Sequence, residues 1–172
     1  MHAPTPTIRR LFSQILFFAI LLSLIIAIAA VSYNIYSLTT EPPAITELRH
    51  LDLPDWISPD LIKIDGASRR GIPLEELNGI VIHYIGNPGT GAQNNRNYFN
   101  NPDSTVSAHF IVGLDGEVIQ YIPLHERSSA SNHRNSDTIS IEVCHPDESG
   151  IFNDITYQAL VRLTAWLCAE CH

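Results

Sequence analysis

Hydrophobic residues follow two different patterns along the chain, and the change between them falls near residue 40. Residues 11–31 are almost wholly apolar, and no Asp, Glu, Lys or Arg occurs between Leu11 and Thr40. A helix over 11–31 is about 31 Å long at about 1.5 Å per residue, which matches the hydrocarbon core of a bilayer. We therefore predict a single transmembrane helix over residues 11–31.

The charges that flank this apolar run predict its orientation. Arg9 and Arg10 precede the run, and no acidic residue occurs before Glu41. The positive-inside rule then places residues 1–10 in the cytoplasm and the later residues outside the cell. A cleaved signal peptide is the alternative, because Ala27-Ile-Ala29 resembles a cleavage site. The apolar run is, however, longer than the usual signal core of about 7–15 residues, which favours the uncleaved anchor.

Residues 32–67 are predicted to be a stalk or linker. Prolines next to acidic residues, as in Glu41-Pro-Pro43 and Leu53-Pro-Asp55, favour extended chain over helix. The domain that follows is assigned to residues 68–172.

Short apolar runs bounded by turn residues predict an α/β domain with a mixed central β-sheet flanked by helices. The expected strands are 79–85, 109–114, 117–122 and 138–144, and the expected helices are 92–100 and a C-terminal helix from Asn153 or Asp154. The run 79–85 is apolar on both faces, as in a central strand covered by helices on each side. Asp115-Gly116 between two strand-forming runs predicts a hairpin with a type I′ turn. Tyr98 and Phe99 are expected to pack inward.

The composition beyond residue 40 limits the possible partners. Of the ten basic residues, only Arg9 and Arg10 precede it, so eight remain against eighteen acidic residues, a net charge of −10. An acidic domain of this kind gives no support to nucleic-acid binding. Three cysteines, an odd number, do not form a disulfide framework.

Three of the predicted strands carry a residue that can do chemistry. Strand 138–144 alternates, with Ile139, Ile141 and Val143 on one face and Ser140, Glu142 and Cys144 on the other. A carboxylate at Glu142 must meet solvent, a partner or a site, because burying it alone costs several kcal/mol. His83 and His109 lie on other strands and are each open to a structural role as core histidines. Convergence of the three residues would suit a zinc hydrolase in which the glutamate moves the proton.

Several motifs in the same order resemble the N-acetylmuramoyl-L-alanine amidase type 2 domain of Firmicutes. The motifs are Arg70-Gly-Ile-Pro73, Asn78-Gly-Ile-Val-Ile-His-Tyr84, Gly86-Asn-Pro-Gly89, Asn94-Asn-Arg-Asn-Tyr-Phe99, Ser107-Ala-His-Phe-Ile-Val-Gly113, Gln120-Tyr-Ile-Pro123 and Ile139-Ser-Ile-Glu-Val-Cys-His-Pro146. The resemblance implies hydrolysis of the amide between N-acetylmuramic acid and L-alanine in peptidoglycan. The chain would act at the cell membrane on the side of a Gram-positive cell wall.

The same resemblance implies roles for individual residues. His83 matches the first zinc ligand and Glu142 the general base, while Tyr84, Asn87, His109 and His133 are implied to contact substrate. Some relatives have a catalytic Tyr where this chain has Ala108. Two further zinc ligands are expected beyond His172, so we expect a domain that is truncated at its C-terminus. A non-catalytic module that binds peptidoglycan is the alternative.

The last five residues, Cys168-Ala-Glu-Cys-His172, also match the C-x-x-C-H pattern of c-type haem attachment. No distal haem ligand is identifiable, and the family has a helix at this place. We therefore favour helix cysteines that face the core.

Overall fold

The computed structural model describes residues 6–40, 45–64 and 66–171. Residues 1–5, 41–44, 65 and 172 lie outside the described part, and with them parts of the predicted cytoplasmic tail and stalk and His172 of the C-x-x-C-H pattern. The chain divides into two compact units, Met1–Glu41 and Pro42–His172.

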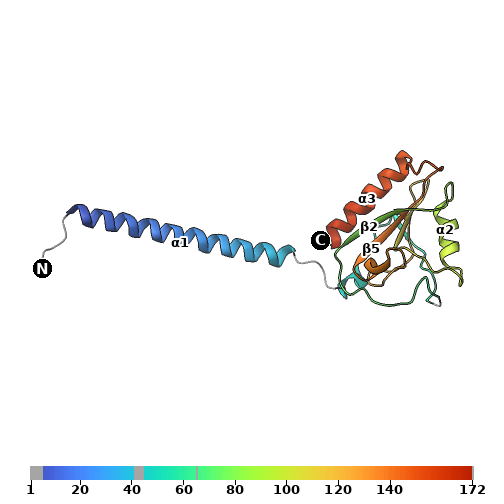
Figure 1. Ribbon diagram of the computed structural model, residues 1–172, viewed down its shortest axis with the longest axis horizontal. Helices are drawn as coiled ribbons and strands as arrows, with labels where there is room; N and C mark the ends of the chain where they lie inside the picture. The colour runs from blue at the N-terminus through green and yellow to red at the C-terminus, as the bar shows by residue number, and fades with distance from the viewer. Residues whose placement is uncertain (1–5, 41–44, 65, 172) are drawn as a thin grey trace. The chain divides into compact units, whose positions relative to one another are not determined.

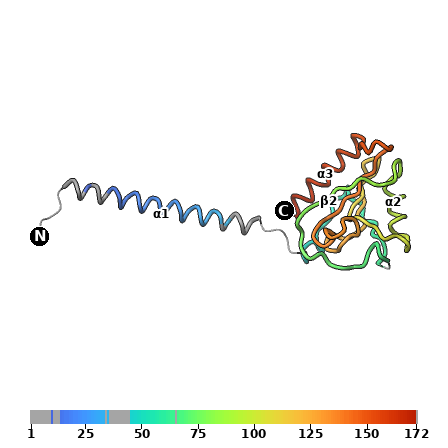
Figure 2. Tube along the Cα trace, viewed as in Figure 1, coloured from blue at the N-terminus to red at the C-terminus, as the bar shows by residue number. Residues whose placement is uncertain are grey.

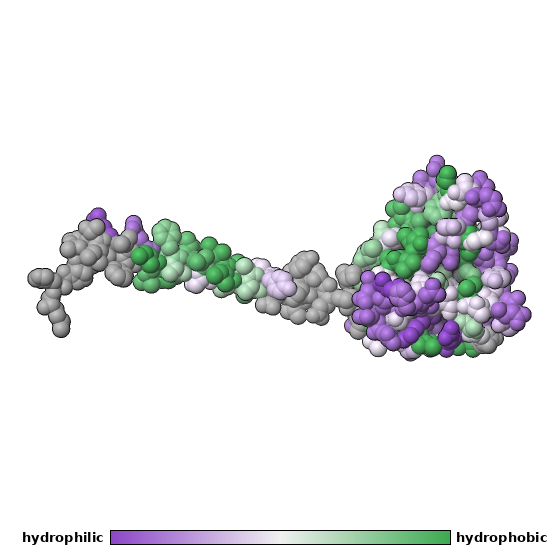
Figure 3. Space-filling view, in the orientation of Figure 1, coloured by the Kyte–Doolittle hydropathy of each residue, from purple (hydrophilic) through white to green (hydrophobic). Residues whose placement is uncertain are grey.

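The first unit is one long helix, α1 (Pro6–Thr40). Its segment Gln14–Tyr33 is long and apolar enough to cross a membrane and is not buried by the rest of the chain. Apolar side chains surround this segment, as the green surface in Figure 3 shows. The predicted span 11–31 lies inside α1. The helix continues to Thr40, so residues 32–40, the first part of the predicted stalk or linker, are helical.

The second unit contains a five-stranded mixed sheet with the strand order β1-β4-β3-β5-β2. Its strands are β1 (Ile57–Pro59), β2 (Gly79–Tyr84), β3 (Phe110–Val112), β4 (Val118–Gln120) and β5 (Thr138–Val143). Only β3 and β4 run antiparallel, while the pairs β1–β4, β3–β5 and β5–β2 are parallel. Two 3₁₀ helices complete the fold, η1 (Glu47–His50) and η2 (Asn132–Ser136). The predicted mixed sheet with flanking helices is confirmed.

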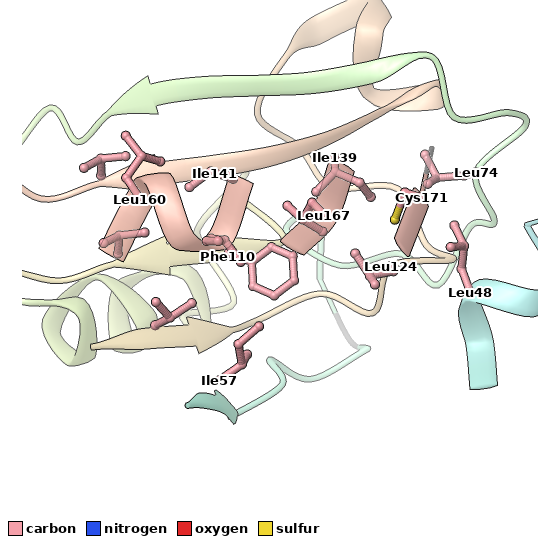
Figure 4. Packing of buried hydrophobic residues seen from close by; sticks show 14 residues of the cluster. Leu48, Ile57, Leu74, Phe110, Leu124, Ile139, Ile141, Leu160, Leu167 and Cys171 are labelled. Carbon is pink, nitrogen blue, oxygen red and sulfur yellow. The ribbon is translucent and has the colours of Figure 1, made fainter. Parts of the chain in front are cut away.

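A helix packs on each face of the sheet (Figures 1 and 2). On one face, α3 (Asp154–Cys171) places Leu160, Leu163 and Leu167 in a core with Phe110 and Ile141 (Figure 4). On the other face, α2 (Ala92–Phe99) buries its ends in a second, smaller core.

The N-terminus of α3 begins where the sequence predicts. The Asn153 side-chain oxygen accepts the backbone N–H of Thr156 at 2.9 Å. This is an N-cap bond, which satisfies one of the free donors at the first turn. The chain therefore enters α3 at a fixed point, and the apolar stripe of the helix faces the sheet.

The structure corrects the predicted position of strand 79–85. β2 pairs only with β5 and forms one edge of the sheet, although its apolar sequence indicates a central strand. Ile82 is 46% exposed and Tyr84 66% exposed. An apolar sequence gives hydrophobicity but not the number of neighbours, so strand order could not be read from it.

The predicted hairpin is present, but its turn is of another type. Gly116 has a φ of +79°, and neither Leu114 nor Asp115 has a positive φ. A type I′ turn needs positive φ at both central residues. The N–H of Gly116 instead bonds the carbonyl of Gly113 at 3.2 Å, as in a type I turn followed by a bulged glycine.

Most of the predicted linker belongs to the folded domain. β1 pairs with β4, and Leu48, Ile57 and Ile62 are all buried. Prolines in this segment are compatible with an edge strand, because β1 has a neighbour on one side only. The predicted boundary at residue 68 is therefore too late.

The packing of α3 predicts a large difference between two positions on this helix. Leu163 is fully buried, so Leu163→Ala should lower the free energy of unfolding by about 2–5 kcal/mol through lost contacts and a cavity. Val161 is 50% exposed, and Val161→Ala should cost about 0.5 kcal/mol or less. Denaturant titration of the full chain in detergent, followed by the fluorescence of Trp56 and Trp166, reports on this domain alone. Equal losses for the two variants would contradict the assigned orientation of α3.

Candidate functional site

The parallel register of β2 and β5 puts two predicted site residues side by side. His83 is the direct partner of Glu142, which in turn faces Ile111 of β3. Partners in a sheet point to the same face, and Ile111 belongs to the core on the α2 side. His83 and Glu142 therefore lie on the α2 side, while Ile141 points to the α3 side. The predicted alternation of strand 138–144 is confirmed.

A cleft of about 490 Å³ opens over Glu142. The β2 end and the loop after it contribute Tyr84 and Asn87, and α2 contributes Asn94 and Tyr98. Tyr84 also packs edge-on against the His145 ring, with centroids 5.5 Å apart. Aromatic faces and amides around one carboxylate give a surface suited to sugars and peptides.

Glu142 is the one carboxyl group among the residues that line this cleft. Its carboxylate has no hydrogen bond or ion pair with any residue that the structure describes. Burial without a compensating charge raises the pKa of Glu142 to about 7. A carboxyl group with this pKa can accept and return a proton near neutral pH, as a general acid–base requires.

His83 is half-buried beside Glu142. Its Nε2 lies 3.0 Å from the Ser131 hydroxyl, which comes from the loop before η2. Among residues 6–40, 45–64 and 66–171, no three His, Cys, Asp or Glu side chains are grouped so that they could hold a metal ion. A structural zinc site has four protein ligands and a catalytic one three. The described residues thus provide His83 as one possible ligand, and they do not fit a complete zinc site.

His109 lies on the same side of the sheet but outside the cleft. Its side chain is fully buried, with Nε2 2.8 Å from the Glu126 carbonyl oxygen and Nδ1 accepting the Ser140 N–H at 3.0 Å. Burial lowers the pKa of His109 to about 4, so the ring is neutral. With both nitrogens occupied and no exposed surface, His109 joins loop to strand and has no contact open to substrate. This differs from the predicted convergence.

His133 lines a separate hollow, together with Arg70, Arg127, Ser128 and Ser129. The structure thus groups Tyr84, Asn87 and Glu142 in one cleft but leaves His133 outside it.

Tyr98 and Asn94 are cleft residues that were not predicted as site residues. Tyr98 was expected to pack inward with Phe99, but it is 59% exposed and lines the cleft with Asn94. Only Phe99 is buried. The signal was present in the helical spacing, because adjacent residues on a helix cannot share one face and Tyr carries a polar hydroxyl.

The chain is similar in sequence to known proteins. Residues 73–172 match the family described as N-acetylmuramoyl-L-alanine amidase. The N-acetylmuramoyl-L-alanine amidase BlyA of Bacillus subtilis (strain 168) is 32% identical over 127 residues, which cover 62% of this chain and 34% of that protein. The chain thus spans about a third of the length of the curated relatives it matches.

Solved structures give the same result for the fold. A mutant endolysin from Bacillus subtilis superposes with a TM-score of 0.56 at 28% identity, covering 66% of this chain and 76% of its own. The catalytic domain of XlyA superposes with a TM-score of 0.55 at 30% identity over the same shares of the two chains.

The burial of Glu142 predicts that the site costs stability. Since the pKa of Glu142 is raised from 4.5 to about 7, the folded domain favours the protonated acid. The domain therefore loses stability as pH rises from about 4.5 to about 7, with no further loss above this range. Glu142→Gln cannot ionise, so it should be more stable than the wild type at pH 8 by about 2–3 kcal/mol. The difference should vanish below about pH 4.5.

The measurement is denaturant unfolding at pH 4 and pH 8, followed by tryptophan fluorescence of the full chain in detergent. Glu148→Gln, at an exposed position, is the matched control and should change stability little at either pH. A Glu142→Gln variant that is less stable than the wild type at pH 8 would show that the carboxylate has a stabilising partner.

Proposed function

The chain belongs to the N-acetylmuramoyl-L-alanine amidase family, and on that premise we propose that its second unit binds peptidoglycan and hydrolyses the amide between N-acetylmuramic acid and L-alanine. The observation that carries the proposal is Glu142, a carboxyl group without a partner at the cleft, with its pKa raised to about 7. Folding does not need such a group, since burying it unpaired costs free energy. Its presence is accounted for by proton transfer.

Glu142 would act on the water that attacks the amide carbonyl. In the ionised form its carboxylate accepts a proton from this water as the new C–O bond forms. It then returns the proton to the leaving amine as the C–N bond breaks, which restores the carboxylate. The apolar surroundings that raise the pKa of Glu142 also keep bulk water from competing for its oxygens.

The other side chains of the cleft would position the substrate. Tyr84 and Tyr98 present exposed rings that can pack on a sugar face or a peptide, while Asn87 and Asn94 can donate to and accept from amides. His83 would stand next to the attacked carbonyl because it is the register partner of Glu142.

Zinc is implied by the sequence resemblance, with His83 as its first ligand. When bound in a complete site, zinc polarises a carbonyl and lowers the pKa of bound water. The described residues offer His83 and no further cluster of ligands, so no step of the mechanism is assigned to a metal here.

The small number of possible metal ligands at the site favours a second candidate function. The cleft is equipped to bind a muropeptide, and His83 lies beside Glu142, but the described residues contain no group of three metal ligands. A non-catalytic module that binds peptidoglycan would need the cleft alone.

We also propose that α1 anchors the domain in the cell membrane. The length and apolar composition of Gln14–Tyr33 support a span. Arg9 and Arg10 before it support a cytoplasmic N-terminus and an outward-facing domain on the side of the cell wall.

The cleavage mechanism predicts a loss of rate at Glu142. Glu142→Gln should reduce hydrolysis of soluble muropeptide by about 100-fold or more, since it removes the proton acceptor. Wild-type activity should rise with pH through about 7, as the carboxylate ionises. Released amino groups measure cleavage, and calorimetry measures muropeptide binding by the same variants. Equal cleavage by wild type and Glu142→Gln contradicts the mechanism, whereas binding without cleavage by the wild type establishes the second candidate.

The incomplete ligand set predicts weak metal binding by this chain. We expect zinc to bind with a Kd of about micromolar or poorer, because one protein ligand cannot hold the ion tightly. A competition titration with a chromophoric chelator measures this value for the wild type and His83→Ala. Tight one-to-one binding that is lost in His83→Ala would mean that further ligands complete the site.

A further inference from the structure

A second hollow, of about 310 Å³, lies beside η2. Arg70, Arg127 and His133 line it together with small polar side chains, and no acidic residue contributes to its lining. This is unusual for a domain in which acidic residues outnumber basic ones by eighteen to eight beyond residue 40. Glu75 pairs with Arg127 from outside the lining, so the positive charge that remains unpaired in the hollow is that of Arg70. A local positive charge on an acidic protein is the condition for binding an anion.

Arg70 supplies the charge that is free to act. Four other arginines, by contrast, form ion pairs: Arg69 with Glu126, Arg96 with Asp60, Arg127 with Glu75 and Arg134 with Asp137. Arg70 is exposed and has no ion pair or hydrogen bond with any residue that the structure describes. Its preceding neighbour Arg69 is buried and bidentate to Glu126, so the backbone before Arg70 is firmly placed.

Arg127 is held in place rather than free. Its Nε donates to the Pro73 carbonyl at 2.9 Å, and one terminal nitrogen donates to Glu75 at 2.6 Å. The remaining N–H groups of its planar guanidinium are therefore presented in a fixed orientation. A fixed donor loses less entropy on binding than a mobile one.

The orientation of Asn135 adds a neutral donor. Its side-chain oxygen accepts the N–H groups of Ala130 at 3.0 Å and Ser131 at 2.7 Å. The amide NH₂ must then lie at the other end of the side chain, and Asn135 lines the hollow. Charged guanidinium groups with a neutral N–H donor match the two oxygens of a carboxylate.

The hollow and the Glu142 cleft share one segment of chain, Ser128–Ser131. Ser128 and Ser129 line the hollow, and Ala130 lines the cleft. Asn135, which lines the hollow, accepts the N–H of Ser131, and the hydroxyl of Ser131 lies 3.0 Å from Nε2 of His83, the register partner of Glu142. A ligand longer than the cleft can therefore continue across this short segment.

We propose that the hollow is a subsite for a free carboxylate of the peptide stem, held by Arg70 and Arg127 while the amide lies at Glu142. The inference rests on the proposed function in taking a muropeptide as the ligand. It assigns a preference for stems with free carboxylates over stems in which these groups are carboxamides.

Calorimetric binding of two soluble muropeptides tests this subsite. One carries the stem with free carboxylates, and the other carries the same stem with carboxamides. The full chain in detergent is used as wild type, Arg70→Gln and Arg134→Gln. Arg134 is the matched control, because it belongs to η2 but pairs with Asp137 and does not line the hollow.

The wild type should bind the carboxylate form about fivefold to tenfold more tightly than the carboxamide form. Arg70→Gln should abolish this preference and leave the affinity for the carboxamide form unchanged, and added salt should reduce the preference. Arg134→Gln should retain it. Because Arg70 is exposed, its replacement should not affect folding, which the tryptophan fluorescence checks.

Three results would overturn the inference. Equal affinity of the wild type for the two muropeptides, or an equal loss in Arg134→Gln, removes the subsite while leaving the proposed function intact. Inorganic phosphate that displaces the carboxylate form at equal concentration would assign the hollow to phosphate instead. No binding of either muropeptide would overturn both the subsite and the proposed function. Loss of cleavage alone does not affect the subsite, since binding is the readout.

Discussion

The site depends on the register between two parallel strands, β2 and β5. Pairing of His83 with Glu142 places both side chains on the α2 side of the sheet, while Ile141 enters the core beneath α3. Because side chains alternate along a strand, a slip of one residue would bury the carboxylate in the α3 core and turn the isoleucines to the α2 side. Burial of the apolar face of β5 against α3 therefore determines that Glu142 lies on the α2 side. The packing of Leu160, Leu163 and Leu167 keeps Glu142 at the cleft without touching it.

Glu142 shows how this fold accommodates a group that does not stabilise it. The domain pairs its buried charges elsewhere, as in the bidentate contact of Arg69 with Glu126, and it satisfies buried His109 through hydrogen bonds at both ring nitrogens. Glu142 alone among these buried groups has no such partner and takes a raised pKa instead. The contrast separates a carboxylate held in a structural ion pair from one without a partner more clearly than burial does. Histidines of the same face also differ in their surroundings, since His109 is enclosed and His83 is half-buried beside Glu142.

The sequence motifs predicted the family, the mixed sheet and the position of Glu142, and all three agree with the comparisons or with the structure. Local patterns were sufficient there because alternation, an N-cap and a run of motifs depend on neighbouring residues. The predicted linker was wrong at Leu48 and Ile57, which are buried in the domain. Both are scattered apolar residues without periodicity. Their burial comes from partners far along the chain, such as β4 for β1. The position of His133 outside the cleft could not be predicted for the same reason. A loop residue takes its neighbours from several segments of the chain.

By itself, then, the sequence determined where the chain is apolar enough to span a membrane, which strands form and which face of β5 carries the acid. These properties follow from composition and from the period of side chains along a strand. Only the tertiary structure decided that β2 lies at an edge, that Tyr98 joins the cleft, and that Arg70 and Arg127 meet across a hollow. The order of strands and the meeting of loops result from contacts between residues distant in sequence. Such contacts leave no periodic pattern that a single sequence could reveal.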